Sequence, residues 1–281
     1  MAAHLFDGVE ARAACREGRP RGAVRLEGEG PGREDERFVH DLSIQREALG
    51  LILSAMSPHE FPFEAVLFDL DGTLVATDRF WVPAARVGAK RAFAELSLER
   101  EIPTAEEWMG LVGLPLAEGF DALFHELTKE QRKVILDRCV EEEHFALDAG
   151  KAALLPGALE VLEELRARGV HTGIASNCSQ RYLDAAMEGM GLGKWVEEGR
   201  CLDSRGIVNK ADMLSDLLIT FDTRSAVMVG DRQGDCVAAK ANSLPFVLCE
   251  NGFLQDWERF ECEGRIPDLL ELIPLLEAGI G

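Results

Sequence analysis

The sequence has no apolar run long enough to cross a membrane. Although 47% of its 281 residues are hydrophobic, no stretch approaches the roughly 18 consecutive apolar residues of a transmembrane helix. The first residues, 1–7, also lack the basic and apolar segments of a signal peptide. We therefore expect a soluble cytoplasmic protein that has no membrane partner.

Basic residues are scarce relative to acidic ones. The chain has 30 Lys and Arg residues against 50 Asp and Glu residues, which gives a formal net charge of -20 at pH 7. An acidic surface repels polyphosphate, so we expect neither nucleic acid nor an anionic membrane as a partner. A small phosphorylated metabolite is repelled as well, and its binding therefore requires cations placed locally in a site.

Cysteine pairs with the close spacing of metal ligands are absent. The seven cysteines are odd in number: Cys15, Cys139, Cys178, Cys201, Cys236, Cys249 and Cys262. In an intracellular protein we expect them to be reduced and mostly buried. We interpret Cys178 in the same way, as part of the core.

The N-terminal region differs in composition from the rest of the chain. Residues 1–38 mix Gly, Arg, Glu and Pro, which is typical of a flexible segment. Residues 41–56 have apolar residues that suit a helix packing on the main body or on a second subunit, so monomer and homodimer both stay open. With Pro62 as a break before the first clear strand, we predict an N-terminal extension over residues 1–60.

A helical pattern follows the first strand for some distance. Apolar positions recur at helical spacing over residues 81–96, 116–127 and 134–147. We therefore predict a separate helical domain over residues 77–151.

Strands and helices alternate in the rest of the chain. Continuous apolar runs predict buried strands at 65–68, 170–175, 225–229 and 245–248. Helical patterns lie between them, at 156–169, 180–190, 211–218 and 237–241. This alternation gives a parallel sheet covered by helices on both faces, so we predict a doubly wound α/β domain made of residues 61–76 and 152–281.

Two acids, Asp69 and Asp71, follow the first buried strand directly. The carboxyl ends of strands are where open α/β sheets bind ligands. Carboxylates this close repel each other, and a divalent cation offsets the repulsion. We interpret the pair as a metal-assisted phosphoryl-transfer site with a carboxylate nucleophile.

The same Asp-x-Asp-Gly pattern also occurs in calcium loops and in ordinary turns. An EF-hand calcium loop requires further oxygen ligands at alternate positions and a Glu at its end. Leu74, Val75 and Ala76 follow here instead, which disfavours the calcium interpretation.

Three further polar clusters follow later elements of the predicted sheet. Ser176 and Asn177 come after one strand, Lys210 begins a helix, and Asp231 and Asp235 come after the strand at 225–229. Because parallel strands end at the same edge of a sheet, we expect these side chains to meet the first pair of acids.

Each cluster also has a simpler interpretation. Ser176 suits the N-cap of the helix that follows, and Lys210 suits a solvated surface charge. A lysine at a helix start opposes the helix dipole, however, unless an anion lies nearby. A surface turn explains an acid at position 231, but not two acids after a buried strand.

The string from Phe68 to Leu74, Phe-Asp-Leu-Asp-Gly-Thr-Leu, resembles the first motif of the haloacid dehalogenase-like (HAD) hydrolase superfamily. The four polar clusters match the four motifs of that superfamily in order and approximate spacing. Residues 113–120 also resemble a phrase found in the helical caps of its phosphoglycolate phosphatase-like branch. The resemblance implies a Rossmann-like core with an all-helical type 1 cap formed by residues 77–151.

The resemblance also implies a role for each acid. Asp69 would be the nucleophile that forms an aspartyl-phosphate, and Asp71 would be the general acid and then the base. Mg²⁺ would be bound by the side chain of Asp69, the backbone carbonyl of Asp71, and the acids Asp231 and Asp235.

The remaining site residues would bind the substrate. Ser176 and Lys210 would neutralise charge on the phosphoryl group, where most of the barrier is lowered. Gly72, Thr73 and Asn177 are further predicted substrate-binding residues.

The resulting hypothesis is a Mg²⁺-dependent phosphatase that acts on a small phosphomonoester, of the 2-phosphoglycolate or sugar-phosphate type. Within the superfamily, an acid at the position of Asp71 favours phosphate esters over haloalkanoates and phosphonates. Two alternatives stay open: a phosphomutase that transfers the phosphoryl group to a sugar, and a non-catalytic binding protein on the same fold.

Overall fold

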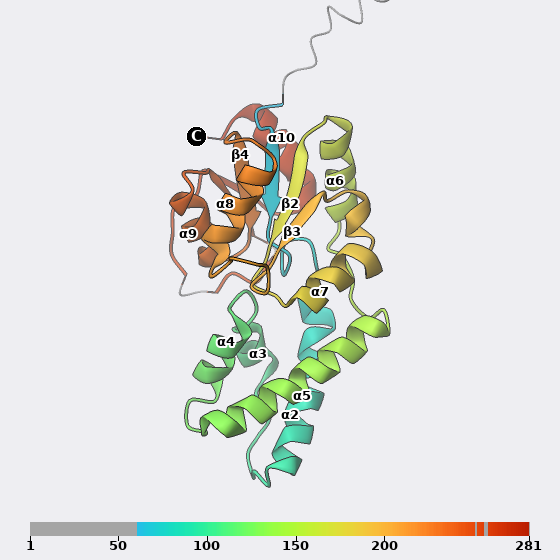
Figure 1. The fold of residues 1–281 in the computed structure, drawn as a ribbon, viewed down its shortest axis with the longest axis vertical. Coiled ribbons are helices and arrows are strands. Elements are labelled where there is room, and N and C mark those ends of the chain that lie inside the picture. The colour runs from blue at the N-terminus through green and yellow to red at the C-terminus, as the bar shows by residue number, and fades with distance from the viewer. Residues whose placement is uncertain (1–60, 251, 256–257, 281) are drawn as a thin grey trace, which may run out of the picture. The chain divides into compact units, whose positions relative to one another are not determined.

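The computed structural model describes residues 61–250, 252–255 and 258–280 (Figure 1). The predicted N-terminal extension, with its helix at 41–56, lies outside these residues. In the part of the chain that is described, no helix has the length and apolar character needed to cross a membrane.

A six-stranded parallel sheet forms the centre of the fold, in the order β3-β2-β1-β4-β5-β6. The strands are β1 (Ala65–Phe68), β2 (His171–Ala175), β3 (Glu198–Arg200), β4 (Ala226–Gly230), β5 (Phe246–Cys249) and β6 (Gly264–Ile266). The four predicted strands are the four central ones. The outer strands β3 and β6 were not predicted.

Alternating side chains of β1 pack on opposite faces of the sheet. Val66 and Phe68 belong to one buried cluster, while Ala65 and Leu67 belong to another. All four residues are fully buried, which explains why the strand is apolar throughout. The sheet is therefore covered on both faces, as the doubly wound α/β prediction requires.

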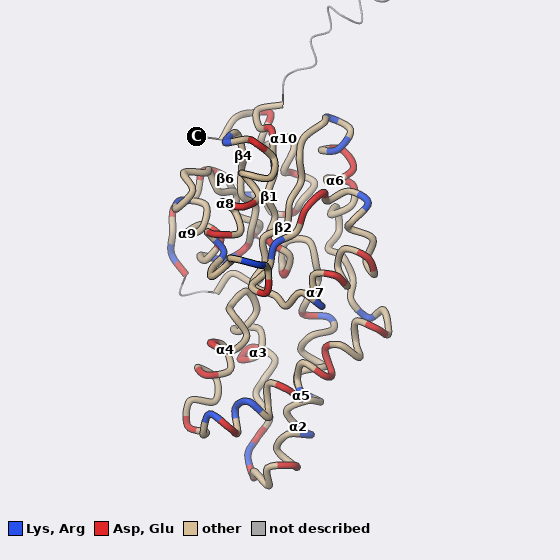
Figure 2. The backbone as a smooth tube through the Cα atoms, in the orientation of Figure 1, with Lys and Arg blue, Asp and Glu red and all other residues tan. Residues whose placement is uncertain are grey.

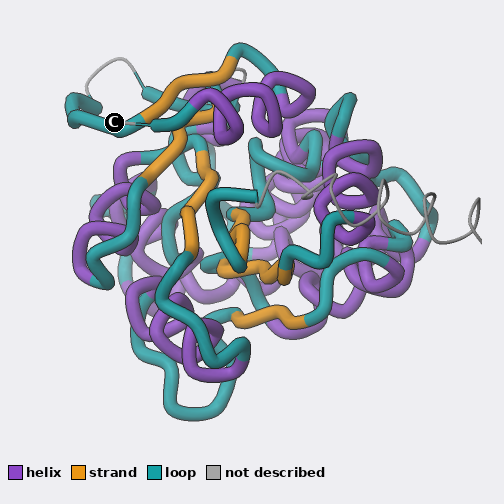
Figure 3. Tube along the Cα trace, turned by 90° about the horizontal axis from the view of Figure 1, so that it is seen from above, coloured by secondary structure: helices purple, strands orange, loops and turns teal. Residues whose placement is uncertain are grey.

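Helices cover the two faces, as Figure 3 shows from above. The first cluster includes residues of α6 (Ala158–Ala167), α7 (Gln180–Asp184) and α10 (Leu272–Ala278). The second includes residues of α8 (Lys210–Thr220) and α9 (Gln233–Ala241). Shorter turns complete this part: π-helical η2 (Ala185–Gly189) and 3₁₀ turns η3 (Leu192–Lys194) and η4 (Leu269–Glu271).

Between β1 and α6 the chain has helices and no named strand. It forms η1 (Thr77–Arg79), α2 (Trp81–Glu95), α3 (Ala105–Met109), α4 (Leu116–Leu123) and α5 (Lys129–Asp148). We call this helical insert the cap. Helix α5 begins earlier than the predicted 134 because Thr128 and Gln131 form a capping box at its start.

Aromatic residues pack together inside the cap. Trp108, Phe120 and Phe124 are fully buried and lie in mutual ring contact. Helices α2 and α5 approach closely at Gly88, where a β-carbon would lie 2.5 Å from the α-carbon of Cys139. Only glycine fits this crossing without displacing a helix.

Candidate active site

The predicted site residues come together at the carboxyl ends of β1, β2 and β4. Asp69 follows β1 and is buried, as is Lys210 at the first position of α8. The Lys210 ammonium donates to Asp69 Oδ1 at 2.8 Å and to Asp235 Oδ1 at 2.6 Å. Lys210 therefore lies between two buried carboxylates and is not the solvated charge of the simpler interpretation.

Asp231 completes a cluster of three acids. It follows β4, is fully buried, and lies with Asp69 and Asp235 such that carboxylate oxygens of the three are within 4.8 Å of one another. One Asp231 oxygen accepts a hydrogen bond from the Phe253 backbone N–H. The structure thus brings Asp231 next to Asp69.

The cluster has too little positive charge for its acids. Among the described residues, Asp69 Oδ2 and Asp231 Oδ1 have no hydrogen-bond partner. Burial raises the pKa of Asp69 to about 7; Lys210 partly opposes this, and Asp235 adds to the rise. Burial likewise raises the pKa of Asp231. Unpaired buried oxygens on converging acids are the donor set of a divalent oxygen-binding cation, so these residues fit a metal ion.

Both carboxylate oxygens of Asp235 accept hydrogen bonds from the protein. Its Oδ1 accepts from Lys210, and its Oδ2 accepts from the Arg232 backbone N–H at 2.9 Å. This arrangement suits a residue that holds Lys210 in place at the edge of the cluster.

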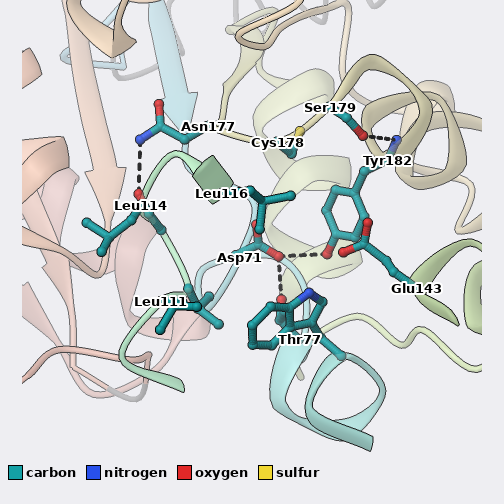
Figure 4. A pocket seen from close by; sticks show the side chains of 13 residues that line it. Asp71, Thr77, Leu111, Leu114, Leu116, Glu143, Asn177, Cys178, Ser179 and Tyr182 are labelled. Carbon is teal, nitrogen blue, oxygen red and sulfur yellow. Dashed lines mark hydrogen bonds between the residues drawn. The ribbon is translucent and has the colours of Figure 1, made fainter. Parts of the chain in front are cut away.

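Asp71 points away from the cluster toward the cap. Its Oδ1 accepts hydrogen bonds from Thr77 Oγ1 at 2.5 Å and from the Tyr182 hydroxyl at 2.6 Å (Figure 4). Burial raises the pKa of Asp71, whereas the bonds from Thr77 and Tyr182 lower it. Two donors on one oxygen fix the orientation of this carboxyl group.

Gly72 and Thr73 form the turn after the two acids of the first motif. Gly72 has φ +75°, and a β-carbon there would collide with the Asp231 carboxylate, so this turn requires glycine. Thr73 is buried, and among the described residues its hydroxyl has no partner. Ser176 is buried at the end of β2, on the same edge of the sheet.

Asn177 connects the core to the cap. Its side-chain amide donates to the Gly113 backbone carbonyl at 2.9 Å, in the loop before α4. Arg232 makes a second link: it binds Glu258 at 2.8 Å and also donates to the Val112 carbonyl. The structure therefore places Asn177 at a closing contact, a position that the sequence did not indicate.

A small pocket lies between Asp71 and the cap (Figure 4). Its walls include Trp81 and Glu143 from cap helices, and Tyr182 and Cys178 from the segment after β2. Cys178, interpreted from the sequence as core, packs against the core and also faces this pocket. Glu143 and Tyr182 had no sequence signal, although Tyr182 is the only tyrosine in the chain.

Most of the chain matches a known protein family. Residues 66–249 match the Haloacid dehalogenase-like hydrolase family, a span that holds every acid of the site. The chain belongs to this family. The resemblance of the four motifs is thereby confirmed.

Curated relatives of this HAD hydrolase are named phosphoglycolate phosphatases. The protein from Rhodospirillum rubrum is 31% identical over 69% of this chain and 82% of its own length. The one from Caulobacter vibrioides is 27% identical over 70% of this chain and 84% of its own length. These relatives confirm the assignment of the chain as a phosphoric monoester hydrolase of the phosphoglycolate phosphatase-like branch.

Solved HAD structures share the fold at lower sequence identity. A "predicted phosphoglycolate phosphatase" from Haemophilus somnus 129pt has a TM-score of 0.67 and 18% identity, covering 76% of this chain and 97% of its own. CbbY from Rhodobacter sphaeroides, solved in complex with phosphate, has a TM-score of 0.62 and 20% identity, covering 75% and 96%. This chain therefore has the HAD hydrolase fold.

Proposed function

We propose that the chain is a Mg²⁺-dependent phosphatase that hydrolyses a small phosphomonoester, of the 2-phosphoglycolate or sugar-phosphate type, through an aspartyl-phosphate on Asp69. The observation that carries the proposal is the convergence of Asp69, Asp231 and Asp235 around Lys210, with one oxygen each on Asp69 and Asp231 left unpaired. An unpaired carboxylate oxygen in a buried site is what a nucleophile or a metal ligand requires.

Mg²⁺ would be held by Asp69, Asp231 and the backbone carbonyl of Asp71, with Asp235 beside them. When bound, it would supply positive charge to the acids and to the phosphoryl oxygens. Because both Asp235 oxygens accept hydrogen bonds from the protein, we assign Asp235 chiefly to orienting Lys210.

The reaction proceeds in two displacements at phosphorus. The free oxygen of Asp69 attacks the phosphoryl group, the bond from phosphorus to the alcohol oxygen breaks, and Asp71 gives its proton to that oxygen. Asp71 then takes a proton from water, which attacks the aspartyl-phosphate and restores Asp69. The raised pKa of Asp71 supports this exchange of a proton.

The other predicted residues bind the phosphoryl group. Lys210 contacts Asp69 directly, so its charge also lies next to any group that Asp69 attacks. Ser176 and Thr73 supply hydroxyl donors from the ends of neighbouring strands, and the Thr73 hydroxyl is without a partner in the described residues. Gly72 lets the turn approach the Asp231 carboxylate closely. Asn177 binds substrate or closes the cap.

The domain boundaries, location and partners form part of the same proposal. Residues 61–76 and 152–281 would form the catalytic core, residues 77–151 the cap over it, and residues 1–60 the extension. We place the enzyme in the cytoplasm, as a monomer or homodimer that binds a small phosphorylated metabolite and no nucleic acid.

A phosphate-release assay on a panel of phosphomonoesters, with and without Mg²⁺, tests the proposal. Turnover should require the metal and should fall by more than about 10³-fold in Asp69→Asn, which keeps the shape of the side chain but removes the nucleophile. Equal activity of this variant would remove Asp69 from the nucleophile role.

The same assay separates the alternatives. A phosphomutase would require a bisphosphate for full activity, whereas a phosphatase requires none. A non-catalytic binding protein would release no phosphate from any ester in the presence of Mg²⁺.

A further inference from the structure

The cap side of the pocket carries an acid that the proposed chemistry does not use. Glu143 lies on α5 and is only 6% exposed. Its carboxyl group is directed toward the Tyr182 hydroxyl at the pocket wall (Figure 4). Burial and then the neighbouring Asp71 raise the pKa of Glu143 to about 8, and Trp81 lowers it by hydrogen bonding.

The rest of the wall offers no positive charge. Of the described residues that line this pocket, none is Lys, Arg or His; the wall is largely apolar, with Leu111 and Leu116 among its members. Trp81 is the hydrogen-bonding partner that lowers the pKa of Glu143, and no cation opposes the effect of burial. A ligand that donates a hydrogen bond would add a second partner for this carboxyl group.

The position of the pocket indicates which part of a substrate enters it. Asp71, the proposed donor of a proton to the leaving oxygen, lines the same pocket as Glu143. The alcohol part of the ester would therefore lie between these two acids. The pocket has a volume of about 40 Å³, and a water-sized group needs roughly 10–15 Å³. It suits a small alcohol.

We propose that Glu143 selects phosphate esters whose alcohol ends in a hydrogen-bond donor, a hydroxyl or an ammonium group, and rejects esters that end in a carboxylate. The inference rests on the proposed function and narrows its substrate class. A donor can bind the Glu143 carboxyl group, which lines the same pocket as Asp71. A carboxylate would meet no cation among the described lining residues, so its charge would stay uncompensated. The substrate named for the curated relatives, 2-phosphoglycolate, is thereby disfavoured.

Three two-carbon esters that differ at their distal end test this proposal: 2-phosphoglycolate, ethylene glycol phosphate and phosphoethanolamine. For the wild-type protein with Mg²⁺, we expect kcat/KM for at least one donor ester to exceed that for 2-phosphoglycolate by about tenfold or more. The ratio of kcat/KM between ethylene glycol phosphate and phosphoethanolamine shows whether the site prefers a hydroxyl or an ammonium group. A preference for 2-phosphoglycolate would overturn the proposal.

Glu143→Gln links the preference to this residue. The variant keeps the size of the side chain, so the ratio of kcat/KM between the favoured donor ester and 2-phosphoglycolate should shrink by about fivefold or more. Glu130→Gln, which removes an exposed charge from the same helix, should leave the ratio unchanged. An unchanged ratio in Glu143→Gln would contradict the assignment.

Ethyl phosphate, which has no polar distal group, tests the phosphatase activity separately. Absence of Mg²⁺-dependent phosphate release from every ester would contradict the proposed function alone. In that case, calorimetric binding of the same three esters to Asp69→Asn still decides the role of Glu143. Tighter binding of a donor ester supports it, and tighter binding of 2-phosphoglycolate overturns it.

Discussion

At the scale of single residues, the site is a set of charges that stabilise one another. Lys210 begins α8, where a positive charge opposes the helix dipole. Burial alone would lower its pKa, but Asp235 and Asp69 raise it above the ordinary value. The ammonium therefore stays charged and compensates acids that would otherwise be uncompensated.

Lys210→Met should lower phosphate release by about 10²–10³-fold, because it removes the one described cation that contacts Asp69. The readout is kcat with saturating Mg²⁺. The matched control, Lys240→Met, removes an exposed lysine from α9 and should retain full activity. Comparable activity of the two variants would contradict the role of Lys210.

The protonation of Glu143 should affect stability in a defined pH window. Its pKa of about 8 in the folded protein lies above the ordinary value of 4.5, so the folded state favours the neutral form. Its contribution to stability is complete below pH 4.5 and is lost as pH rises through about 8.

Glu143→Gln should therefore have nearly the Tm of the wild type near pH 5 and a Tm higher by several degrees near pH 9. Thermal unfolding without substrate between these values measures the difference, with Glu130→Gln as the control. A Tm difference that does not change with pH would mean that Glu143 does not titrate as described.

The acids of the motifs were predictable because they follow buried strands, where a charged side chain is rarely found unless it is paired or binds a metal or ligand. Glu143 was not, because it lies on a cap helix far from those motifs in sequence. Tyr182 lies close to Ser176 and Asn177, but on a helix where nothing in the sequence marks it as a site residue. A polar residue on an amphipathic helix looks like a solvent-facing one until the fold shows what it faces.

At the scale of elements, the helices of the cap depend on close packing. Gly88 on α2 faces Cys139 on α5, whose thiol donates to the Ala85 carbonyl at 3.3 Å. Glycine lets the two helices pack closely at this crossing, and this packing offsets the poor helix propensity of glycine.

Gly88→Ala should destabilise the protein by about 1–3 kcal/mol, because overpacking exceeds the gain in helix propensity. In Gly234→Ala on α9, the added β-carbon meets nothing within 4 Å, so stability should rise by up to about 1 kcal/mol. Denaturant unfolding of both variants measures the difference. A Gly88→Ala protein as stable as Gly234→Ala would contradict the packing of α2 on α5.

Element type was easier to predict than element limits. The central strands were predictable because they are apolar throughout. The outer strands β3 and β6 have only three residues each, with charged residues and glycine among them, so no periodic pattern marks them. The predicted helix at 180–190 is an α-helix to Asp184, which then continues as a π-helical turn.

At the scale of the whole molecule, acidic residues outnumber basic ones and occur on many elements. Figure 2 shows acidic segments on helices of the cap and of the sheet domain, including α5 and α6. The net charge of -20 opposes the approach of a phosphate dianion. Lys210 attracts it only at short range.

Added salt should therefore assist substrate binding. Raising KCl from about 10 mM to about 150 mM shortens the screening length from about 30 Å to about 8 Å. The KM for a dianionic ester should fall a few-fold at fixed saturating Mg²⁺, while kcat stays constant. A KM that rises with salt would indicate that local cations, and not the net charge, control the approach.

The central claim is that Asp69 accepts the phosphoryl group within a site completed by a divalent cation. Rapid acid quenching during turnover, followed by peptide mass analysis, tests it most directly. We predict one phosphoryl group on the peptide that contains Asp69, present with Mg²⁺ and absent without it. Rapid turnover with phosphate on a different residue, or on none, would contradict the account.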